Sequence, residues 1–246
     1  MEKIIGILGG MGPEATVDLY AKIIRATGAT RDQDHLRVII DSNPKIPDRT
    51  AAILNGGVDP IPALVETACN LERAGADLIA MPCNTAHFFH AAVQKAVAIP
   101  ILHMPLETAG YIRTSLPSVK RVGLLATTGT VKSGIYAEAC TRNGLEMLSP
   151  DDPMQELVTI AIFGPQGIKA GGRDLPRQQL LMAAESLIAR GVDAIILGCT
   201  EIPLALQPGM LPLPLVDATQ ILAEAAIAAA RTADSEQSTE HPSVAS

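Results

Sequence analysis

Two cysteine-containing turns, 116 residues apart, constrain the fold of this chain more than any other feature. Cys83 and Cys199 each follow a short apolar run, and each is followed by small hydroxyl or amide residues, in the segments MPCNT and LGCTE. This pattern is typical of a buried parallel strand that ends in a turn. Because ligands of open α/β sheets bind beyond the carboxyl ends of the strands, we expect both thiols to lie at a ligand-binding edge.

The residues around the two cysteines also repeat along the chain. Gly-Ala-Asp at 75–77 recurs as Gly-Val-Asp at 191–193 with the same 116-residue spacing, and the turn at 6–12 resembles the segment at 123–129. A repeat this long exceeds a solenoid unit and predicts two homologous halves. Two halves that face each other would place one thiol on each side of a shared cleft. Such a pair suits a reaction that removes a proton from one face of a carbon and returns a proton to the other.

A cysteine at the end of a strand can also be a small core hydrophobe, and that interpretation stays open for either thiol taken alone. Cys69 and Cys140 match no repeated motif, so we expect them to be core or surface thiols. The chain has no Cys-x-x-Cys pair and no clustered histidines, which disfavours a zinc site. Four cysteines in a chain of this type indicate thiols in a reducing compartment. We therefore expect a cytoplasmic protein without a metal ion.

The composition disfavours nucleic-acid and membrane partners. The 246 residues, 48% of them hydrophobic, are enough for one large or two modest α/β domains. Aromatic residues make up only 2%, so stacking platforms for single-stranded nucleic acid are not expected. A net charge of −7 means that an acidic substrate would need specific local cations. No apolar run reaches the roughly 18–20 residues of a membrane span, and the amino-terminal residues lead directly into a strand without a signal-peptide pattern.

Apolar periodicity predicts alternating strands and helices along both halves. In the first half we expect strands at 3–8, 36–41, 77–80 and 99–101, and helices that begin at Pro13 and span 61–73 and 86–97. In the second half we expect strands at 119–125 and 193–196, a helix ending near 143, and helices near 154, at 175–190 and at 217–232. The polar residues 233–246 are expected to form a disordered tail.

The first turn formally matches the dinucleotide-binding fingerprint through Gly10-Met11-Gly12. The nearest acidic residue at a strand end, Asp41, lies beyond the usual distance of about 20 residues. We therefore interpret these glycines as a close strand–helix turn beside a small ligand. A nucleotide-binding oxidoreductase is the competing interpretation, and binding of NAD would support it.

Two basic side chains are candidates for binding an anion. Arg49 lies in a proline-rich polar loop, where its guanidinium could hold a carboxylate through two parallel hydrogen bonds. A solvated or salt-bridged arginine is the alternative. Lys169 lies in the glycine-rich segment 164–172, which could close over a cleft or form a plain surface turn.

Polar residues after two of the predicted strands are further candidates. Asn84 and Thr85 lie at the amino end of a predicted helix, where free N–H groups favour an anion. Thr127 and Thr130 follow the first strand of the second half, and their hydroxyls could bind carboxylate oxygens or cap a helix. We expect His87 to cap or pack, without reacting.

These motifs resemble those of the aspartate/glutamate racemase superfamily over roughly residues 3–232. The resemblance rests on GGMGP at 9–13, PCNTAH at 82–87 and GCTE at 198–201. Glutamate racemases typically carry an Asp-Ser pair in the first turn and a histidine after the second Cys-Thr. This chain has Gly9-Gly10 and Glu201 at those places, so it is more similar to the aspartate racemase branch.

The resemblance implies an α/β fold of two pseudosymmetric, doubly wound parallel-sheet domains with the active site between them. The first lobe would comprise residues 1–103 together with a returning segment at 212–232, and the second lobe residues 104–211. It also implies a homodimer that interconverts L- and D-aspartate without pyridoxal phosphate, metal or nucleotide.

The resemblance further implies a role for each candidate residue. Cys83 and Cys199 would be the two acid/base groups, and Arg49 and Lys169 would hold the side-chain carboxylate of an acidic amino acid. The other implied substrate-binding residues are Asn84, Thr85, Thr127, Thr130 and Thr200 at the α-carboxylate and ammonium end, Glu201 near the ammonium, and Met11.

Other functions remain open at this point. Within the same fold, the alternatives are a glutamate or broad-specificity racemase, and a decarboxylase or isomerase of related acids. Related decarboxylases typically keep only one of the two cysteines, so the presence of both favours racemisation. A non-catalytic amino-acid-binding protein is an alternative from a different class, and it would bind aspartate without changing its optical rotation.

Overall fold

Two parallel sheets form the centre of the computed structural model, which describes residues 2–231. The first sheet has the order β2-β1-β3, with β1 at Ile5–Gly9, β2 at Val38–Ser42 and β3 at Leu78–Ala80. The second has the order β5-β4-β6-β7, with β4 at Arg121–Leu125, β5 at Glu146–Leu148, β6 at Ala194–Leu197 and β7 at Leu215–Asp217. All of these strands pair in parallel, which confirms the predicted α/β fold with two parallel sheets. The predicted tail at 233–246 lies outside the described residues.

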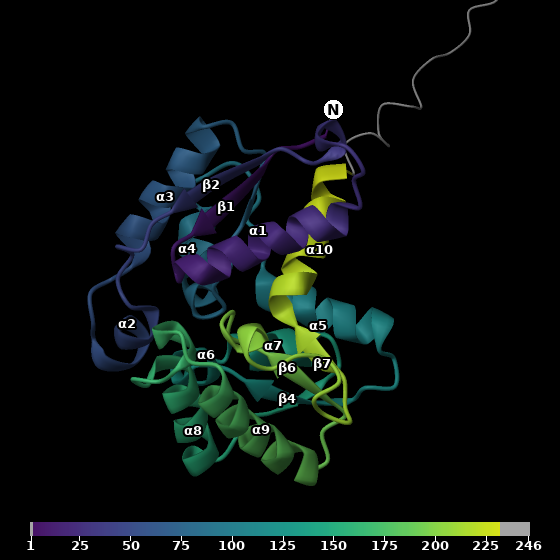
Figure 1. The fold of residues 1–246 in the computed structure, drawn as a ribbon. Helices are drawn as coiled ribbons and strands as arrows, with labels where there is room; N and C mark the ends of the chain where they lie inside the picture. Colours follow the sequence, from purple (N-terminus) through teal and green to yellow (C-terminus); the bar gives the residue numbers. More distant parts are fainter. Residues whose placement is uncertain (1, 232–246) are drawn as a thin grey trace, which may run out of the picture.

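Helices cover both sheets (Figure 1). Around the first sheet lie α1 (Pro13–Thr27), α3 (Ile61–Arg73) and α4 (His90–Gln94), with the short 3₁₀ turns η1 (Asp32–Asp34) and η2 (Thr85–Phe89). The following chain contributes α5 (Met104–Ser115), α6 (Thr128–Ser133), α7 (Ile135–Arg142), α8 (Asp152–Phe163) and α9 (Asp174–Ala189), with the turns η3 (Ile168–Ala170) and η4 (Ile202–Leu204). The helix α2 (Arg49–Asn55) lies apart from the first sheet and packs against α6 (Figure 1). Local sequence explains several boundaries: Pro13 begins α1, and Gly28 ends it in the left-handed conformation.

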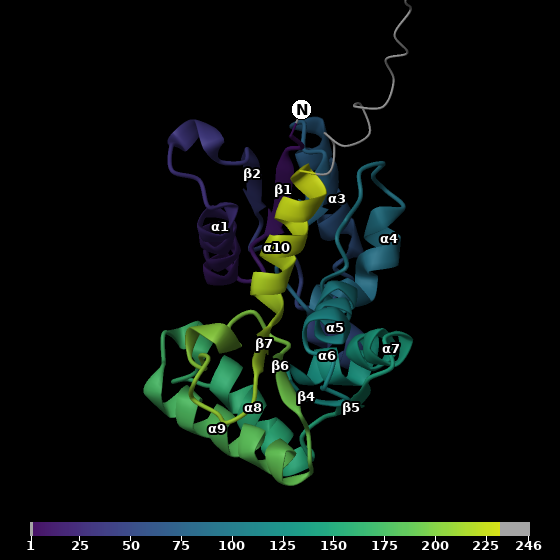
Figure 2. The same ribbon diagram turned by 90° about the vertical axis from the view of Figure 1, so that its right-hand side faces the viewer.

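The last helix, α10 (Ala218–Arg231), connects the two lobes. It begins directly after β7 of the second sheet and packs against α1 and α5. Figures 1 and 2 show it in yellow, leaving the second sheet and running along the first. A buried lysine of α1, Lys22, holds the junction through ion pairs with Asp18 at 2.5 Å and Asp217 at 2.8 Å. Strand pairing assigns β7 to the second sheet, whereas the predicted boundary at residue 212 stays a prediction.

Several predicted elements differ from the structure. The predicted helix at 86–97 is the 3₁₀ turn η2 followed by the short α4, because the imidazole of His87 bonds to the carbonyl of Cys83 at 2.9 Å and replaces a helical backbone bond. The predicted helix ending near 143 is split into α6 and α7 by Gly134, which has a φ of 74°. The predicted strand at 99–101 is reduced to a single bridge between Ile79 and Ile101. The helices α2 and α5 and the strands β5 and β7 were not predicted.

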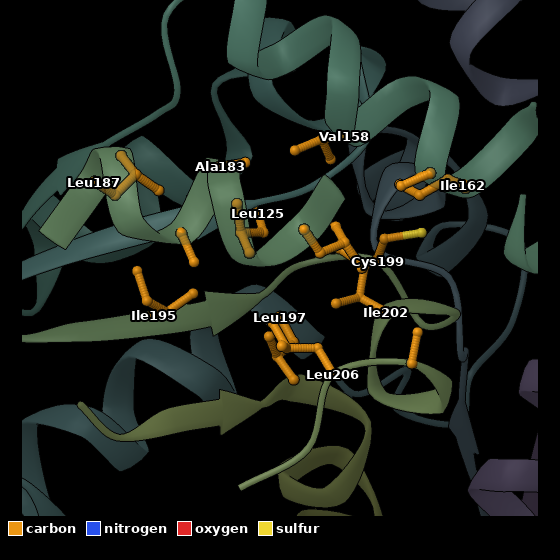
Figure 3. Packing of buried hydrophobic residues seen from close by; sticks show 14 of the residues in the cluster. Leu125, Val158, Ile162, Ala183, Leu187, Ile195, Leu197, Cys199, Ile202 and Leu206 are labelled. Atoms are coloured by element: carbon orange, nitrogen blue, oxygen red, sulfur yellow. The ribbon is translucent and has the colours of Figure 1, made fainter. Parts of the chain in front are cut away.

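The apolar core is distributed over the faces of both sheets. One cluster fills the space between the second sheet and helices α8 and α9, and Figure 3 shows Cys199 at one end of it. Cys83 occupies an equivalent place in a cluster between the first sheet and α3. Each cysteine is therefore anchored by a core and lies where that core ends.

Candidate functional site

A narrow cavity lies between the two lobes, at the carboxyl ends of β1, β3, β4 and β6. The first lobe lines it with Met11, Asp48, Arg49, Thr50, Cys83, Asn84 and Thr85, and the second with Thr127, Phe163, Lys169, Cys199, Thr200 and Glu201. All the sequence-predicted site residues except Thr130 line this cavity.

Both repeated cysteines line this cavity, and each has only 6% of its surface exposed. Cys83 follows β3 and Cys199 follows β6, which are equivalent strands next to the first strand of each sheet. All four cysteines are free thiols, and neither Cys69 nor Cys140 is part of the cavity wall. Burial raises the pKa of the Cys140 thiol to about 11, so it is an inert core thiol.

Cys199 is hydrogen-bonded to an acidic side chain. Its Sγ lies 3.1 Å from Oε2 of Glu201, and Oε1 of the same carboxylate lies 2.5 Å from Nζ of Lys169. Glu201 is only 4% exposed, so protein groups rather than water stabilise its charge. A Cβ atom at Gly12 would lie 3.3 Å from Oε1 of Glu201 and 3.4 Å from Nζ of Lys169. The first glycine turn therefore packs directly on this ion pair.

The charges of this group shift two pKa values. Burial raises the pKa of Cys199 well above its ordinary range, and the negative charge of Glu201 raises it further. Burial disfavours the charge of Lys169, but the carboxylate of Glu201 outweighs this effect, and the pKa of Lys169 is raised. Cys199 is thus a protonated thiol beside a charged Lys–Glu pair.

Asn84 presents an amide donor to the cavity. Its Oδ1 accepts a hydrogen bond of 2.6 Å from the hydroxyl of Tyr136, a fully buried residue of α7. Its Nδ2 is buried and has no partner within the described part of the chain. Because the oxygen is held by Tyr136, the NH₂ group is available to an acceptor bound in the cavity.

Three threonines join the lobes beside the cysteines. The hydroxyl of Thr85 lies 3.0 Å from that of Thr127 and 2.7 Å from that of Thr130, and the last two are 3.0 Å apart. Thr127 also caps α6, as predicted for a threonine after this strand. Thr130 is 1% exposed and does not line the cavity, so its contacts orient the two threonines that do.

Arg49 lines the cavity as the first residue of α2. Its Nη1 donates to the carbonyls of Ile46 and Pro47 at 3.2 and 3.0 Å. Its Nε is buried without a partner among residues 2–231. Arg49 is partly exposed and forms no salt bridge within residues 2–231. Part of its guanidinium orders the proline-rich loop, and a donor remains.

His87 supports the first cysteine turn from behind. Its Nε2 accepts the backbone N–H of Met104 at 3.1 Å, so the proton lies on Nδ1 and is donated to the carbonyl of Cys83 at 2.9 Å. Burial, with a smaller effect of His103, lowers the pKa of His87 to about 3. These contacts agree with the expectation that His87 packs and takes no part in the reaction.

Sequence reasoning missed four residues of the site: Asp48, Thr50, Phe163 and Tyr136. Asp48 caps α2 through a 2.6 Å bond from the N–H of Ala51, so recognition of a helix in the proline-rich loop would have found it. The ring of Phe163 lies 5.8 Å from Nζ of Lys169. No sequence pattern around Phe163 or Tyr136 marks either as a site residue, because both lie in helices and not in the turns that follow the strands.

The described residues include no group of three or more His, Cys, Asp and Glu side chains with the geometry of a metal site. None of the helices within residues 2–231 combines the length and apolar character needed to cross a membrane. At the first turn, which formally matches the dinucleotide-binding fingerprint, a Cβ at Gly10 would lie 2.3 Å from the backbone of Asn43. That glycine is accounted for by close packing of the chain.

Comparison with known proteins identifies the family of this chain. The model of the family described as Asp/Glu/hydantoin racemase matches residues 8–226, which is most of the chain. The chain belongs to this family. It is 31% identical to the broad specificity amino-acid racemase RacX of Bacillus subtilis (strain 168), over 91% of this chain and 96% of that protein.

Solved structures of the family have the same fold. An aspartate racemase of Picrophilus torridus is 33% identical, with a TM-score of 0.80 over 93% of this chain and 94% of that one. A glutamate racemase of Francisella tularensis, solved with D-glutamate, is 18% identical and has a TM-score of 0.69 over 93% of this chain and 81% of that one. The second likeness concerns the fold alone. The chain is thus an amino-acid racemase of the Asp/Glu racemase family.

Proposed function

We propose that this racemase interconverts L- and D-aspartate through two bases, Cys83 and Cys199, without a cofactor. The observation that carries the proposal is that one thiol from each lobe lines the same cavity. Racemisation needs a base on one face of the α-carbon and an acid on the other. A thiolate and a thiol on opposite walls fulfil both roles and exchange them with the handedness of the substrate.

The difficult step is removal of a proton from the α-carbon of a free amino acid. The negative charge that develops on the α-carboxylate must be stabilised by fixed donors. Nδ2 of Asn84 and the hydroxyls of Thr85, Thr127 and Thr200 are the donors that we assign to this role. Because these groups are held in place before the substrate arrives, little reorganisation is needed during the reaction.

Two cations support an acidic substrate. Arg49 and Lys169 lie on the cavity wall of a protein with a net charge of −7, so they supply the local positive charge that the overall field does not. We assign them to the side-chain carboxylate. The likeness to the aspartate racemase of Picrophilus torridus also supports aspartate.

The proposal is tested by incubating the pure protein with L-aspartate in deuterated water, followed by chiral analysis. We expect D-aspartate with deuterium at the α-carbon. The variants Cys83→Ala and Cys199→Ala should lose racemisation of both enantiomers, because each direction needs both groups. We expect each variant to retain α-proton exchange of one enantiomer, and Cys69→Ala is the matched control outside the cavity. Full racemisation by either cavity variant would refute the two-thiol mechanism.

A broad-specificity racemase is the second candidate. In the structure Lys169 is paired with Glu201, and Nη1 of Arg49 is bonded to its own loop, so the cations are already partly engaged. The likeness to RacX of Bacillus subtilis also favours this candidate. Comparison of kcat/KM for aspartate, glutamate and neutral amino acids decides between the two.

The remaining alternatives give different outcomes in the same assay. A non-catalytic binding protein would bind aspartate without incorporating deuterium, and an oxidoreductase would be stabilised by NAD in a thermal-shift measurement. We expect neither result. The homodimer and the cytoplasmic location stay predictions, which sedimentation analysis and cell fractionation would test.

A further inference from the structure

Three threonine hydroxyls form a closed ring at the junction of the two lobes. The Oγ1 atoms of Thr85 and Thr127 lie 3.0 Å apart, and that of Thr130 lies 2.7 Å from the first and 3.0 Å from the second. We call this group the threonine ring. Thr85 and Thr127 line the cavity, one from each lobe, whereas Thr130 is 1% exposed and is not part of the cavity wall. Two of the three hydroxyls are therefore placed to contact a substrate.

The threonine ring has as many hydrogens as contacts. Each hydroxyl has one hydrogen to donate and two lone pairs that accept. Three hydrogens fill the three contacts when every hydroxyl donates to the next, and the order can run in either direction, because either oxygen of each contact can be the donor. The remaining lone pair of Thr127 accepts the backbone N–H of Thr130 at 3.2 Å. In the closed ring, neither cavity threonine has a free hydrogen.

A substrate carboxylate competes for these hydrogens. The three oxygens form a nearly equilateral triangle, so each hydrogen lies away from the straight line along which a hydrogen bond is strongest. A carboxylate is a better acceptor than a hydroxyl, since charge-assisted hydrogen bonds are roughly twice as strong as neutral ones. Thr85 and Thr127 therefore turn their hydrogens to the carboxylate, and their oxygens become free to accept. The hydrogen that remains within the ring is that of Thr130.

We propose that Thr130 is a positioning residue that acts as a hydrogen-bond switch, donating its single hydrogen to either Thr85 or Thr127. A hydroxyl that accepts a hydrogen bond is a better donor, because the bonds of a chain polarise one another. The inference rests on the proposed function, in which Thr85 and Thr127 stabilise the α-carboxylate. Thr130 acts on the substrate through these neighbours, and this differs from the direct substrate binding that the resemblance implies.

A switch of this kind suits a reaction that runs in both directions. Thr85 belongs to the lobe of Cys83, and Thr127 to the lobe of Cys199. The thiolate lies on the first lobe in one direction and on the second in the other, so the electric field at the two hydroxyls changes with the handedness of the substrate. Rotation of one buried hydroxyl adapts the donors to either case without movement of the backbone.

The main test removes the hydroxyl and keeps the shape of the side chain. In Thr130→Val the cavity threonines lose the donor that polarises them. We expect kcat to fall about 10-fold in both directions and KM to change much less, because the donors matter most where negative charge develops in the transition state. The two enantiomers have equal free energies, so kcat/KM must fall equally in both directions, which checks the measurements.

Two further substitutions separate the hydroxyl from the shape. Thr130→Ser keeps the hydroxyl and should restore the wild-type kcat. Thr130→Cys carries a thiol, which is a weak donor, so it should resemble Thr130→Val and keeps the test decisive if valine disturbs folding. The matched control is Thr27→Val, which changes a buried threonine of α1 whose hydroxyl donates to the carbonyl of Ile23 at 2.7 Å. It should leave kcat and KM unchanged.

A double-mutant cycle tests whether Thr130 acts through its neighbours. Thr85→Val removes one of the two hydroxyls that can accept the hydrogen of Thr130. Thr130→Val should therefore lower kcat by a smaller factor in this background than in the wild type. Independent roles would give factors that multiply.

Three results would overturn the inference. They are an unchanged kcat in both Thr130→Val and Thr130→Cys, a loss that Thr130→Ser does not restore, and factors that multiply in the cycle with Thr85→Val. Failure of the proposed function gives a different result, because the wild-type protein would then form no deuterated D-aspartate.

Discussion

At the scale of single residues, Arg49 combines two functions in one guanidinium. Nη1 orders the loop by bonding to the carbonyls of Ile46 and Pro47, while the buried Nε has no partner in the described structure. We predict that Arg49→Ala raises KM for aspartate about 10- to 100-fold, the effect of one lost charge-assisted hydrogen bond. KM for alanine should change much less. Steady-state kinetics with both substrates measure this.

The control for Arg49→Ala is Arg113→Ala, which removes an exposed arginine in the last turn of α5. It should leave both KM values unchanged. Equal losses for aspartate and alanine in Arg49→Ala would mean that the residue orders the loop and takes no part in recognising the side chain.

Tyr136 acts on the site through Asn84. Removal of its hydroxyl leaves Oδ1 of Asn84 buried without a donor, which costs roughly 1–3 kcal/mol. We predict that Tyr136→Phe lowers the free energy of unfolding by this amount and raises KM, because the amide is no longer held with Nδ2 towards the cavity. Urea unfolding and kinetics measure the two effects.

Tyr111→Phe is the matched control, since Tyr111 is 38% exposed on α5. It should change neither quantity. If Tyr136→Phe lost stability but kept the wild-type KM, Asn84 would be oriented by some other contact.

Residues next to a strand end could be predicted, and residues that arrive from elsewhere could not. Cys83, Asn84 and Thr85 follow β3 directly, so a local pattern of apolar run and turn was enough to bring them to the cavity. Tyr136 and Phe163 reach the site only through the packing of α7 and α8, which no local pattern specifies. The contact between Glu201 and Cys199 depends on side-chain rotamers, which no local pattern in the sequence specifies.

At the scale of elements, the turn after β1 and the break between α6 and α7 both depend on a glycine with positive φ. Gly10 has a φ of 94° and Gly134 a φ of 74°. A Cβ at Gly10 would lie 2.3 Å from the backbone of Asn43, whereas a Cβ at Gly134 would meet nothing within 4 Å. Substitution at Gly134 therefore causes backbone strain alone, whereas substitution at Gly10 causes both backbone strain and steric overlap.

We predict that Gly134→Ala lowers the free energy of unfolding by about 1 kcal/mol, the cost of a left-handed alanine. Gly10→Ala should lose roughly 1–3 kcal/mol more, because the backbone of Asn43 must also move. Urea denaturation of the two variants and the wild type measures the difference. Equal losses would show that the turn can open at little cost and that its glycines are not required by packing.

At the scale of the whole molecule, the internal repeat predicted two sheets, but not how the lobes are joined. The junction is built from contacts between distant segments, including the pairing of Lys22 with Asp217 and the bond from Tyr136 to Asn84. The position of α10 follows from its apolar surface, which is buried against α1 and α5. Such contacts are determined by three-dimensional packing, so a repeat in the sequence does not predict them.

His87 belongs to this junction, because it links the carbonyl of Cys83 to the first residue of α5, Met104. Its pKa is lowered by burial to about 3. Below about pH 6.5 the unfolded chain binds a proton that the folded protein does not accept until about pH 3. The folded state therefore loses stability as the pH falls through this window, by up to roughly 4–5 kcal/mol.

We predict that the free energy of unfolding falls less steeply between pH 6.5 and 3 in His87→Gln than in the wild type, whatever the absolute stability of the variant. His103, whose pKa is lowered to about 4 mainly by burial, remains in both proteins and accounts for part of the slope. His35→Gln, which removes a histidine outside the junction, should retain the wild-type slope. Urea unfolding at a series of pH values measures all three. If His87→Gln kept the full slope, the proton would be taken up elsewhere, and the neutral imidazole would not be what holds Cys83 and α5 together.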